Sequence, residues 1–479
     1  MTQPSSENYQ HAFAEALFRR QQEYAPQVAR GTVRERKAKL RRLHDCLLRR
    51  RHEMYAAMQA DFGKGETEVN ISEIGVINTE IRHTIRHLNS WLTPKRVGTP
   101  MMLIGTRSEI RYEAKGVCLI LSPWNFPFNL ALAPLVSAVA AGNCVILKPS
   151  EYTPHSAALI KSIVEECFPP EEVSVLEGGP DLAQHLTELP FNHIFFTGSP
   201  AVGKLVMAAA ARNLASVTLE LGGKSPVLVD ESADLDVAAK KIAWLKALNA
   251  GQCCIACDYV LVHESVHDAL VEKLGEKFRR FYGDSPEARK ASPDYCRMVN
   301  DRHFARVQSL LDDAVQRGAK IAFGGHLDAG ERYFDPTVLT DVPDDAVIWQ
   351  EEIFGPPMLI RPYKTLDEAL AFINAGPRPL SMSIFSARHS AIETALNQTR
   401  VGTTTVNDAG ISFYHSDLPF GGVNNSGFGK CHGHHGFLEF VNQRGVSYQN
   451  RIFPHTNLFH PPYKSKIADL MLRGVMRWF

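Results

Sequence analysis

The sequence has no long apolar run and no excess of charge of either sign. Its 479 residues include 52 basic and 52 acidic side chains, so the composition predicts no nucleic-acid partner. Charged residues, Pro or Gly interrupt every apolar stretch before the roughly 20 residues that a membrane helix requires. The first residues, MTQPSSENYQ, lack the apolar core of a signal peptide. We therefore expect a soluble, cytoplasmic protein without an integral membrane segment.

Cysteine is sparse, and its count of nine is odd, which predicts reduced thiols rather than a disulfide framework. The basic run from Arg34 to Arg51 contains leucines at helical spacing and predicts a solvated helix face. The tail from Tyr463 to Phe479 mixes apolar and basic residues. For this tail we expect a helix docked on the protein or on a second subunit, and an interfacial membrane helix is the alternative.

The order of local patterns predicts an α/β fold. A chain of this length exceeds the size of one growing core, so more than one substructure is expected. The first hundred residues are predicted to be helical, with Thr32 as an N-cap and with Gly63 and Gly65 ending a long amphipathic segment. Strands and helices alternating in the next part indicate a doubly wound parallel sheet. The predicted strands are 117–121, 144–147, 173–176, 193–196 and 217–219.

A second series of alternations begins after Gly223 and predicts a second α/β unit. It starts with strand 226–229, helix 235–249, strand 259–262 and helix 265–281. The stretch LPFGGVNNSGFGK closes this part of the chain, and its repeated Gly and Asn indicate frequent turns or close contacts.

Four segments carry residues suited to chemistry. GQCCIACDY places thiols in a loop between a predicted helix and a strand, where nucleophiles are often found. LELGGKSP ends a strand at Glu220, and SPWNFP presents the Asn125 amide, a suitable donor to an oxyanion. In TGSPAVGK, Gly198 and Gly203 flank a helix start whose amides can bind phosphate, although the three-glycine dinucleotide fingerprint is absent. Taken alone, each segment could equally be structural: a buried thiol, a strand-end carboxylate or a turn. The prediction of a catalytic site therefore depends on all four segments occurring together.

These motifs resemble those of the aldehyde dehydrogenase superfamily over nearly the whole chain. The motifs, in the superfamily's order, are PWNFP, LKPSEYTP, FTGSPAVGK, LELGGKSP, GQCCIACDY, QEEIFGPP and LPFGGVNNSGFGK. The chain is most similar to the class 3 branch, which includes fatty and aromatic aldehyde dehydrogenases, and within it to bacterial coniferyl aldehyde dehydrogenases.

The resemblance implies a division of the chain into domains. The NAD(P)-binding domain would comprise residues 1–92 and 115–223, and the catalytic domain residues 224–406. A bridging and oligomerisation element, residues 93–114 and 407–450, would pair two subunits into a homodimer, and residues 451–479 would be a C-terminal tail.

The resemblance also implies the roles of individual residues. Cys254, the last Cys of Gly-Gln-x-Cys, would be the nucleophile rather than Cys253, Glu220 the general base, and Asn125 the oxyanion donor. The thiolate would form a thiohemiacetal with the aldehyde, hydride loss would leave a thioester, and water activated by Glu220 would hydrolyse it. The implied cofactor-binding residues are Trp124, Lys148, Glu151, Gly198, Ser199, Gly203, Leu221, Glu352 and Phe354.

The implied cofactor is NAD, with NADP as the alternative. Lys148 would attract a 2′-phosphate, whereas Glu151 would accept hydrogen bonds from a free 2′-hydroxyl and repel that phosphate. The expected substrate is an aromatic aldehyde such as coniferaldehyde, and a medium- or long-chain fatty aldehyde is the alternative. A relative that passes the thioester to coenzyme A and a catalytically silent relative are further alternatives. Glu220 favours hydrolysis, because acylating members commonly lack this carboxylate.

Two patterns suggest a metal, but we expect none. Cys254 and Cys257 form a Cys-x-x-Cys, yet a zinc site needs a second pair of ligands, and only His432, His434 and His435 offer one. A disulfide from Cys254 to Cys253 or Cys257 under oxidation is the stronger alternative.

His263 and His267 match His-Glu-x-x-His, a pattern that binds zinc when both histidines share one helix face. Here His263 is expected to end a strand and Ser265 to cap the next helix, so the two rings should diverge.

Overall fold

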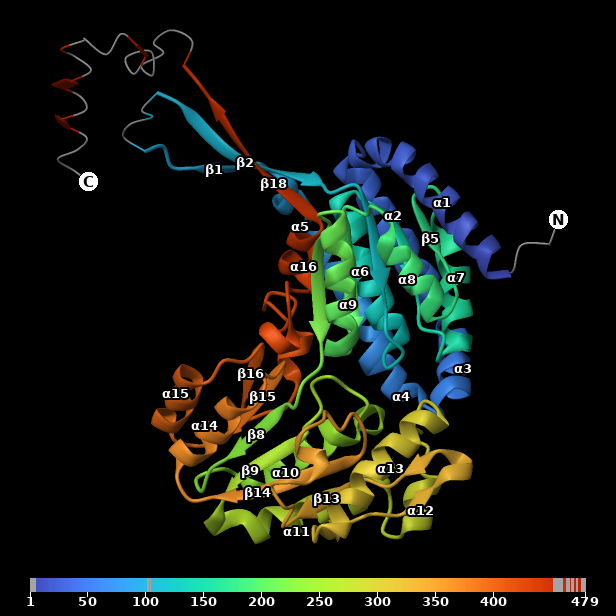
Figure 1. Ribbon diagram of the computed structural model, residues 1–479, viewed down its shortest axis with the longest axis vertical. Helices are drawn as coiled ribbons and strands as arrows, with labels where there is room; N and C mark the ends of the chain where they lie inside the picture. The colour runs from blue at the N-terminus through green and yellow to red at the C-terminus, as the bar shows by residue number, and fades with distance from the viewer. Residues whose placement is uncertain are drawn as a thin grey trace.

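Two open, mostly parallel sheets form the framework of the computed structural model (Figure 1). The structure describes residues 6–100, 103, 105–450 and the positions 460, 461, 466, 469, 470, 473 and 474. The helix predicted from Tyr463 to Phe479 therefore lies for the most part outside the described residues. Within them, no helix combines the length and apolar character that crossing a membrane demands. The predicted α/β class is confirmed.

The first sheet has six strands in the order β17-β7-β6-β3-β4-β5, and only β17 is antiparallel to its neighbour. Its strands are β3 (Val117–Leu121), β4 (Cys144–Lys148), β5 (Val173–Val175), β6 (His193–Gly198), β7 (Ser216–Leu221) and β17 (Gly427–Phe428). Chain order reverses at β3, since β4 and β5 follow on one side and β6 and β7 on the other. Ligands of doubly wound sheets bind in the crevice at the carboxyl ends of the strands beside such a reversal.

Helices bury both faces of this sheet, which explains why its strands are continuously apolar. Alternate residues such as Leu119 and Ile120 belong to different core clusters on the two faces. One face carries α1 (Ser6–Ala29), α8 (Pro180–Glu188) and α9 (Pro200–Arg212). The other carries α2 (Val33–Arg49), α3 (Arg51–Phe62), α5 (Gly75–Leu92), α6 (Pro127–Ala141) and α7 (Pro154–Cys167), with the short α4 (Glu66–Val69) nearby.

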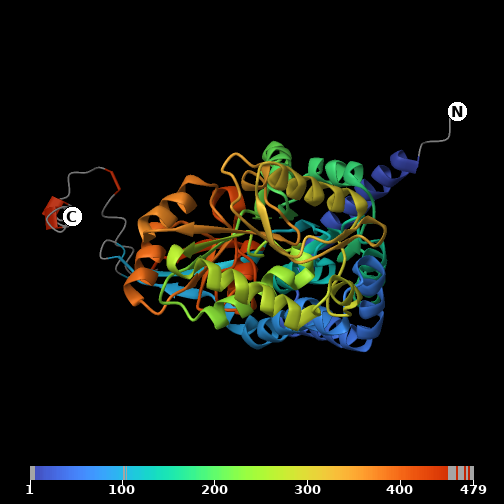
Figure 2. The ribbon, with the colours of Figure 1, turned by 90° about the horizontal axis from the view of Figure 1, so that it is seen from below.

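The second sheet has seven strands in the order β10-β13-β14-β9-β8-β15-β16, with only β10 antiparallel to its neighbour. Its strands are β8 (Pro226–Val229), β9 (Tyr259–His263), β10 (Lys320–Phe323), β13 (Thr337–Thr340), β14 (Pro357–Tyr363), β15 (Ser381–Phe385) and β16 (Thr403–Val406). The helices on opposite faces are visible from below (Figure 2). One face carries α10 (Leu235–Ala247) and α11 (His267–Tyr282), and the other α13 (Asp301–Gln316), α14 (Leu366–Ala375) and α15 (His389–Gln398). Smaller elements are α12 (Pro286–Ala291) and the paired strands β11 (Leu327–Asp328) and β12 (Tyr333–Phe334).

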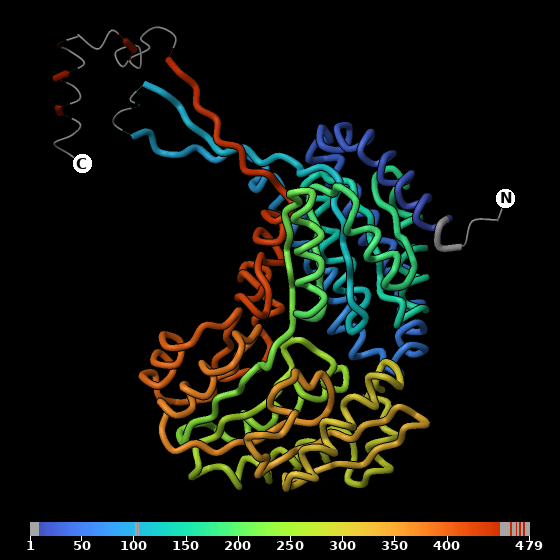
Figure 3. The backbone as a smooth tube through the Cα atoms, viewed as in Figure 1, coloured from blue at the N-terminus to red at the C-terminus, as the bar shows by residue number. Residues whose placement is uncertain are grey.

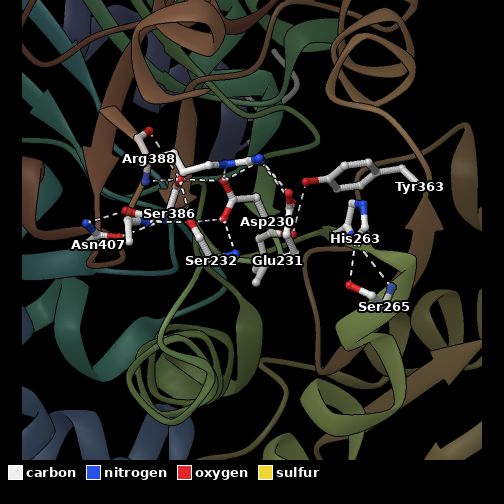
Figure 4. A network of polar contacts seen from close by, with 11 residues as sticks. Asp230, Glu231, Ser232, His263, Ser265, Tyr363, Ser386, Arg388 and Asn407 are labelled. Atoms are coloured by element: carbon white, nitrogen blue, oxygen red, sulfur yellow. Dashed lines mark hydrogen bonds and ion pairs between the residues drawn. The ribbon is translucent and has the colours of Figure 1, made fainter. Parts of the chain in front are cut away.

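A polar network closes the carboxyl edge of this second sheet (Figure 4). Asp230, just after β8, accepts hydrogen bonds from the Ser386 hydroxyl at 2.5 Å and from Arg388 at 3.1 Å. Asn407, just after β16, exchanges two hydrogen bonds of 3.0 Å with the backbone of Ser386. These bonds tie together the ends of β8, β15 and β16. The cysteine-rich loop lies at the opposite edge, because it precedes β9.

A third sheet projects from the body of the molecule (Figure 1). It comprises β1 (Lys95–Val97), β2 (Arg107–Ala114) and β18 (Val441–Tyr448), and both neighbouring pairs are antiparallel. The backbone leaves the first sheet after β7 and later returns to it through β17 and α16 (Gly433–Glu439), which packs on α5 and α6 (Figure 3). The returning segment therefore places residues near 427–439 beside the end of β7.

Most predicted elements are confirmed, but two local expectations were wrong. Thr32 does cap α2 through a capping box with Glu35, yet the amphipathic segment breaks at Arg50 into α2 and α3 before ending at Gly63. Ser265 does not cap α11. A short 3₁₀ turn, Glu264–Val266, intervenes, and the His263 ring accepts from the Ser265 N–H.

Candidate active site

Cys254 lies in a tightly held loop between α10 and β9. The loop begins with a 3₁₀ turn, Leu248–Gly251, in which Asn249 and Ala250 both have φ of 52°, a backbone region uncommon outside Gly. The Asn249 amide donates to the backbone oxygens of Asn125 at 2.7 Å and Gln252 at 3.0 Å. These bonds fasten the loop to the segment after β3, so the thiol has a fixed place between the two large sheets.

Three hollows meet at Cys254. The largest is a cleft of about 630 Å³ at the carboxyl ends of β3 and β6, where the chain order of the first sheet reverses. The other two are small and mainly apolar, and Leu130 and Phe413 line both of them. One of these also contains the rings of Phe126, Trp244 and Tyr414. The thiol is therefore accessible both from a large cleft and from an apolar, ring-lined hollow.

The surroundings of Cys254 disfavour ionisation of its thiol. A hydrogen bond with the neighbouring Cys253 thiol and burial raise the pKa of Cys254 well above its usual value, and Glu352 and Glu220 add to the effect. Because the thiolate is the nucleophilic form, a base has to remove this proton. All nine cysteines lie among the described residues and are free thiols, so the suggested oxidation to Cys253 or Cys257 stays a hypothesis.

Glu220 is a buried carboxyl group near the end of β7, opposite Gly427 of β17. It is 6% exposed, and the Cys431 thiol lies within hydrogen-bonding reach of its carboxyl group, whereas no nitrogen or oxygen donor among the described residues does. Burial raises the pKa of Glu220 well above its usual value, while Lys430 acts in the opposite direction. A carboxyl group in this state can exchange a proton with a bound substrate or water.

Asn125 follows β3 and lines the large cleft together with Cys254 and Glu220. Its side-chain nitrogen donates to Gln252 O at 3.2 Å, the one hydrogen bond from this nitrogen within the described part of the chain. A primary amide has two N–H donors, so one remains for a ligand. The three residues predicted to be catalytic thus line one cleft.

Most of the predicted cofactor residues also line this cleft. These are Trp124, Gly198, Ser199, Leu221, Glu352 and Phe354. Burial, followed by the charge of Asp258, raises the pKa of Glu352 to about 8. A Cβ at Gly222 would overlap the Glu352 carboxylate, so any other residue there would displace the end of the Glu352 side chain.

Three predicted cofactor residues are not part of the cleft lining. Lys148 and Glu151 form an ion pair of 3.1 Å after β4. Gly203 instead packs against Leu221, since a Cβ at Gly203 would lie only 2.8 Å from the Leu221 side chain. Its role in the structure is to let α9 approach β7.

Two cations near the cleft were not predicted from the sequence. Lys224 donates to the backbone oxygens of Ile348 and Glu351, both at 2.8 Å, and Arg306 donates to Glu352 O at 3.2 Å. They hold the loop that carries Glu352 and Phe354. Lys224 directly follows the LELGG motif and could have been inferred from it, whereas Arg306 lies within α13 without a local signal.

The histidines of the two metal-binding patterns suggested by the sequence contact other side chains. The His263 ring contacts Ser265 and packs edge-on against Tyr363 (Figure 4). His267 instead hydrogen-bonds to Asp268. His432 packs on Phe413, and His434 on Trp91. Over the described residues, no group of three His, Cys, Asp or Glu side chains could hold a metal ion.

The cleft fits a nicotinamide dinucleotide. It occupies the sheet reversal where such cofactors bind, and the amino end of the 13-residue helix α9 follows Ser199 in its wall. Backbone N–H groups at a helix start suit a pyrophosphate, and a carboxylate such as Glu352 suits ribose hydroxyls. A thiol, a carboxyl group and an amide lie beside this cleft, an arrangement that suits a nicotinamide-dependent oxidoreductase.

The comparisons with known proteins identify the family. Residues 3–446 match the aldehyde dehydrogenase family, and the chain belongs to it. A 4,4'-diaponeurosporen-aldehyde dehydrogenase of Staphylococcus aureus is 43% identical over 431 residues, covering 90% of this chain and 92% of that protein. Aldehyde dehydrogenase family 3 member A2 of Pongo abelii is 42% identical over 412 residues, covering 86% of this chain and 83% of the relative.

A solved structure agrees with this assignment. The substrate-bound state of Staphylococcus aureus AldH matches with a TM-score of 0.91 and 41% identity, covering 96% of this chain and 98% of that chain. The predicted class 3-like branch is confirmed by the family 3 relatives. The protein is an aldehyde dehydrogenase that uses NAD(P).

Proposed function

We propose that the protein oxidises an aromatic, coniferaldehyde-like aldehyde to its carboxylic acid through a thioester on Cys254. The observation that carries this proposal is the position of Cys254, where the large cleft meets the ring-lined hollow. The cleft would hold the cofactor, and the rings of Phe126, Trp244 and Phe413 would hold a flat, apolar aldehyde.

The residues of the chain would act in a fixed sequence. Glu220 takes the Cys254 proton, and the thiolate adds to the aldehyde carbon. The Asn125 amide and the Cys254 N–H stabilise the negative oxygen of the adduct. A nicotinamide cofactor held in the cleft would supply the hydride acceptor, and loss of the hydride would leave a thioester on Cys254. Glu220 releases the Cys254 proton to solvent and then takes a proton from water, which attacks the thioester carbon, and release of the acid leaves the Cys254 thiolate.

Replacing Asn125 by Ala is expected to lower kcat about 100- to 1000-fold, because one oxyanion donor is lost. The measurement is steady-state NADH formation, with the melting temperature as a check on folding. The isosteric Asn125→Asp variant should lose at least as much, since it places a carboxylate where negative charge develops. Activity within a few-fold of wild type in both variants would rule out this role for Asn125.

NAD is the proposed cofactor, with NADP as the alternative, and Glu151 beside Lys148 supports this preference. Glu151→Gln removes a charge that would repel a 2′-phosphate, so it should raise the ratio of kcat/KM for NADP to that for NAD about tenfold. Glu165→Gln, an exposed carboxylate on α7, is the control and should leave the ratio unchanged. An unchanged ratio in Glu151→Gln would mean that Glu151 does not contact the ribose 2′-hydroxyl of the cofactor.

A panel of aldehydes tests the substrate. Coniferaldehyde should give a higher kcat/KM than decanal without added coenzyme A, whereas the opposite order would favour a medium- or long-chain fatty aldehyde. The diaponeurosporen-aldehyde named for the Staphylococcus relative supports an apolar aldehyde generally. Activity only on addition of coenzyme A would indicate an acylating enzyme, and no activity a silent relative.

The domain assignments and the assembly belong to the same proposal. Residues 1–92 with 115–223 would bind the cofactor, and residues 224–406 would carry Cys254. The projecting sheet of β1, β2 and β18, within segments 93–114 and 407–450, would pair two subunits of a cytoplasmic homodimer. Its largely exposed residues support this role. Sedimentation equilibrium should give twice the chain mass.

A further inference from the structure

A small cavity lies beside both Cys254 and Glu220. Its volume is about 40 Å³, and its lining also includes Cys431 and His432. Most of the remaining wall is apolar, with Leu130, Phe413 and Phe420 among its residues. A water molecule needs about 10–15 Å³ of such space together with polar partners, so at least one water has room here.

Three polar side chains of this cavity have buried atoms without a nitrogen or oxygen partner among the described residues. These atoms are both carboxyl oxygens of Glu220, the Nε2 atom of His432 and the Oδ1 atom of Asn129, and Glu220 has only the Cys431 thiol within hydrogen-bonding reach. Glu220 and His432 are each 6% exposed, so bulk water does not compensate for these groups. Buried polar atoms are rarely left unpaired, because desolvation without a hydrogen bond is costly. A water molecule in the cavity could donate one hydrogen bond to Glu220 and one to His432.

The His432 ring is held in place by its neighbours. His432 precedes α16 with φ of 69°, a strained value for a residue with a side chain. Glu80 accepts the Gly433 N–H at 2.9 Å, and its other oxygen lies 3.8 Å from His432 Nδ1. The ring meets Phe413 edge-on at 4.7 Å between centroids. The nearby Glu80 carboxylate favours the proton on Nδ1, which leaves Nε2 as an acceptor.

We propose that His432 is a positioning residue that orients the water for thioester hydrolysis. This inference rests on the proposed roles of Cys254 and Glu220. One water hydrogen is donated to the Glu220 carboxylate and the other to His432 Nε2, so a lone pair of the water oxygen is free to attack. The new C–O bond forms as the C–S bond breaks, Glu220 takes one proton, and the thiolate of Cys254 leaves.

His432→Phe and His432→Gln test the inference. Phe keeps a ring against Phe413 but has no nitrogen, whereas Gln restores a polar atom near Nε2. The measurements are the rate of the first NADH turnover by rapid mixing, the steady-state rate, and the fraction of acylated chain by intact mass, with coniferaldehyde or decanal. His434→Phe, which alters a ring outside the cavity lining, is the control.

The Phe variant should keep the first-turnover rate within about twofold and lose about tenfold or more in steady-state rate, with acylated chain accumulating. The Gln variant should recover several-fold of that loss, and His434→Phe should match wild type. Hydrolysis at the wild-type rate in His432→Phe would overturn the inference. So would equal loss of both phases with a lower melting temperature. If Glu220→Gln also accumulates no acylated chain, the thioester proposal itself fails, which is a separate outcome.

Discussion

Replacing Cys254 by Ala is expected to abolish NADH formation with every aldehyde, a loss of at least about 10⁴-fold. The reason is that this thiol is the point where the large cleft and the ring-lined hollow meet, and no covalent adduct can form without it. The measurement is NADH absorbance with coniferaldehyde, benzaldehyde and decanal in parallel.

Cys257→Ala is the matched control for that variant. Cys257 is buried in the same loop but lines none of the three hollows at Cys254, so its replacement should preserve activity within a few-fold. Loss of activity in Cys257→Ala with an unchanged melting temperature would instead favour a Cys-x-x-Cys redox pair. Undiminished activity in Cys254→Ala would contradict the thioester mechanism.

Replacing Glu220 by Gln is expected to stop the enzyme after about one turnover. Without the carboxylate, the steady-state rate should fall about 100- to 10,000-fold, the usual contribution of a general base. NADH should still appear at up to about one equivalent per subunit, but more slowly, because hydroxide or water rather than Glu220 has to take the Cys254 proton. The measurement is a rapid-mixing trace at pH 9, compared with wild type.

The pH dependence of wild-type hydrolysis follows from the same group. Because burial raises the pKa of Glu220, the carboxyl stays protonated to a higher pH than an exposed glutamate would. Only the deprotonated form can accept a proton, so the hydrolysis rate should rise with pH through the raised pKa and level off above it. The Glu220→Gln variant should lack this rise. A rate that falls over the same range would be inconsistent with Glu220 as the base.

The Glu352→Gln variant distinguishes the role of Glu352 from that of Glu220, the other carboxyl group of the cleft. Glu352 is also buried, with its pKa raised to about 8, but it lies beside Gly222 in the part of the cleft proposed to bind the cofactor. Its replacement should raise the KM for NAD and slow the first turnover, with no accumulation of acylated chain. The same behaviour in both variants would mean that Glu220 acts on the cofactor rather than on water.

The sequence predicted the sheets and singled out three candidate catalytic residues that line one cleft, because both have strong local signals. Strands buried on two faces are continuously apolar, so β3 and β8 were located to the residue. Asn125 and Glu220 stand in short motifs at the carboxyl ends of β3 and β7, and such ends of parallel strands meet at one edge of a sheet. Cys254 stands in a short motif before β9 of the second sheet.

Features that depend on distant contacts were not predictable from local patterns. Arg50 interrupts a segment whose periodicity continues across it, and the turn at 264–266 displaces the start of α11 by two residues from Ser265. The positive φ values of Asn249 and Ala250 have no local cause and arise in a loop fastened to Asn125. His432 reaches the cavity of Glu220 only because β17 pairs with β7 and α16 packs on α6.

The most direct test is the mass of the Glu220→Gln variant after mixing with NAD and decanal and rapid quenching in acid. The thioester mechanism predicts one decanoyl group per chain, located on the peptide that contains Cys254 and absent when Cys254 is also replaced by Ala. Continued turnover without an adduct, or an acyl group on a different peptide, would contradict the central role of Cys254.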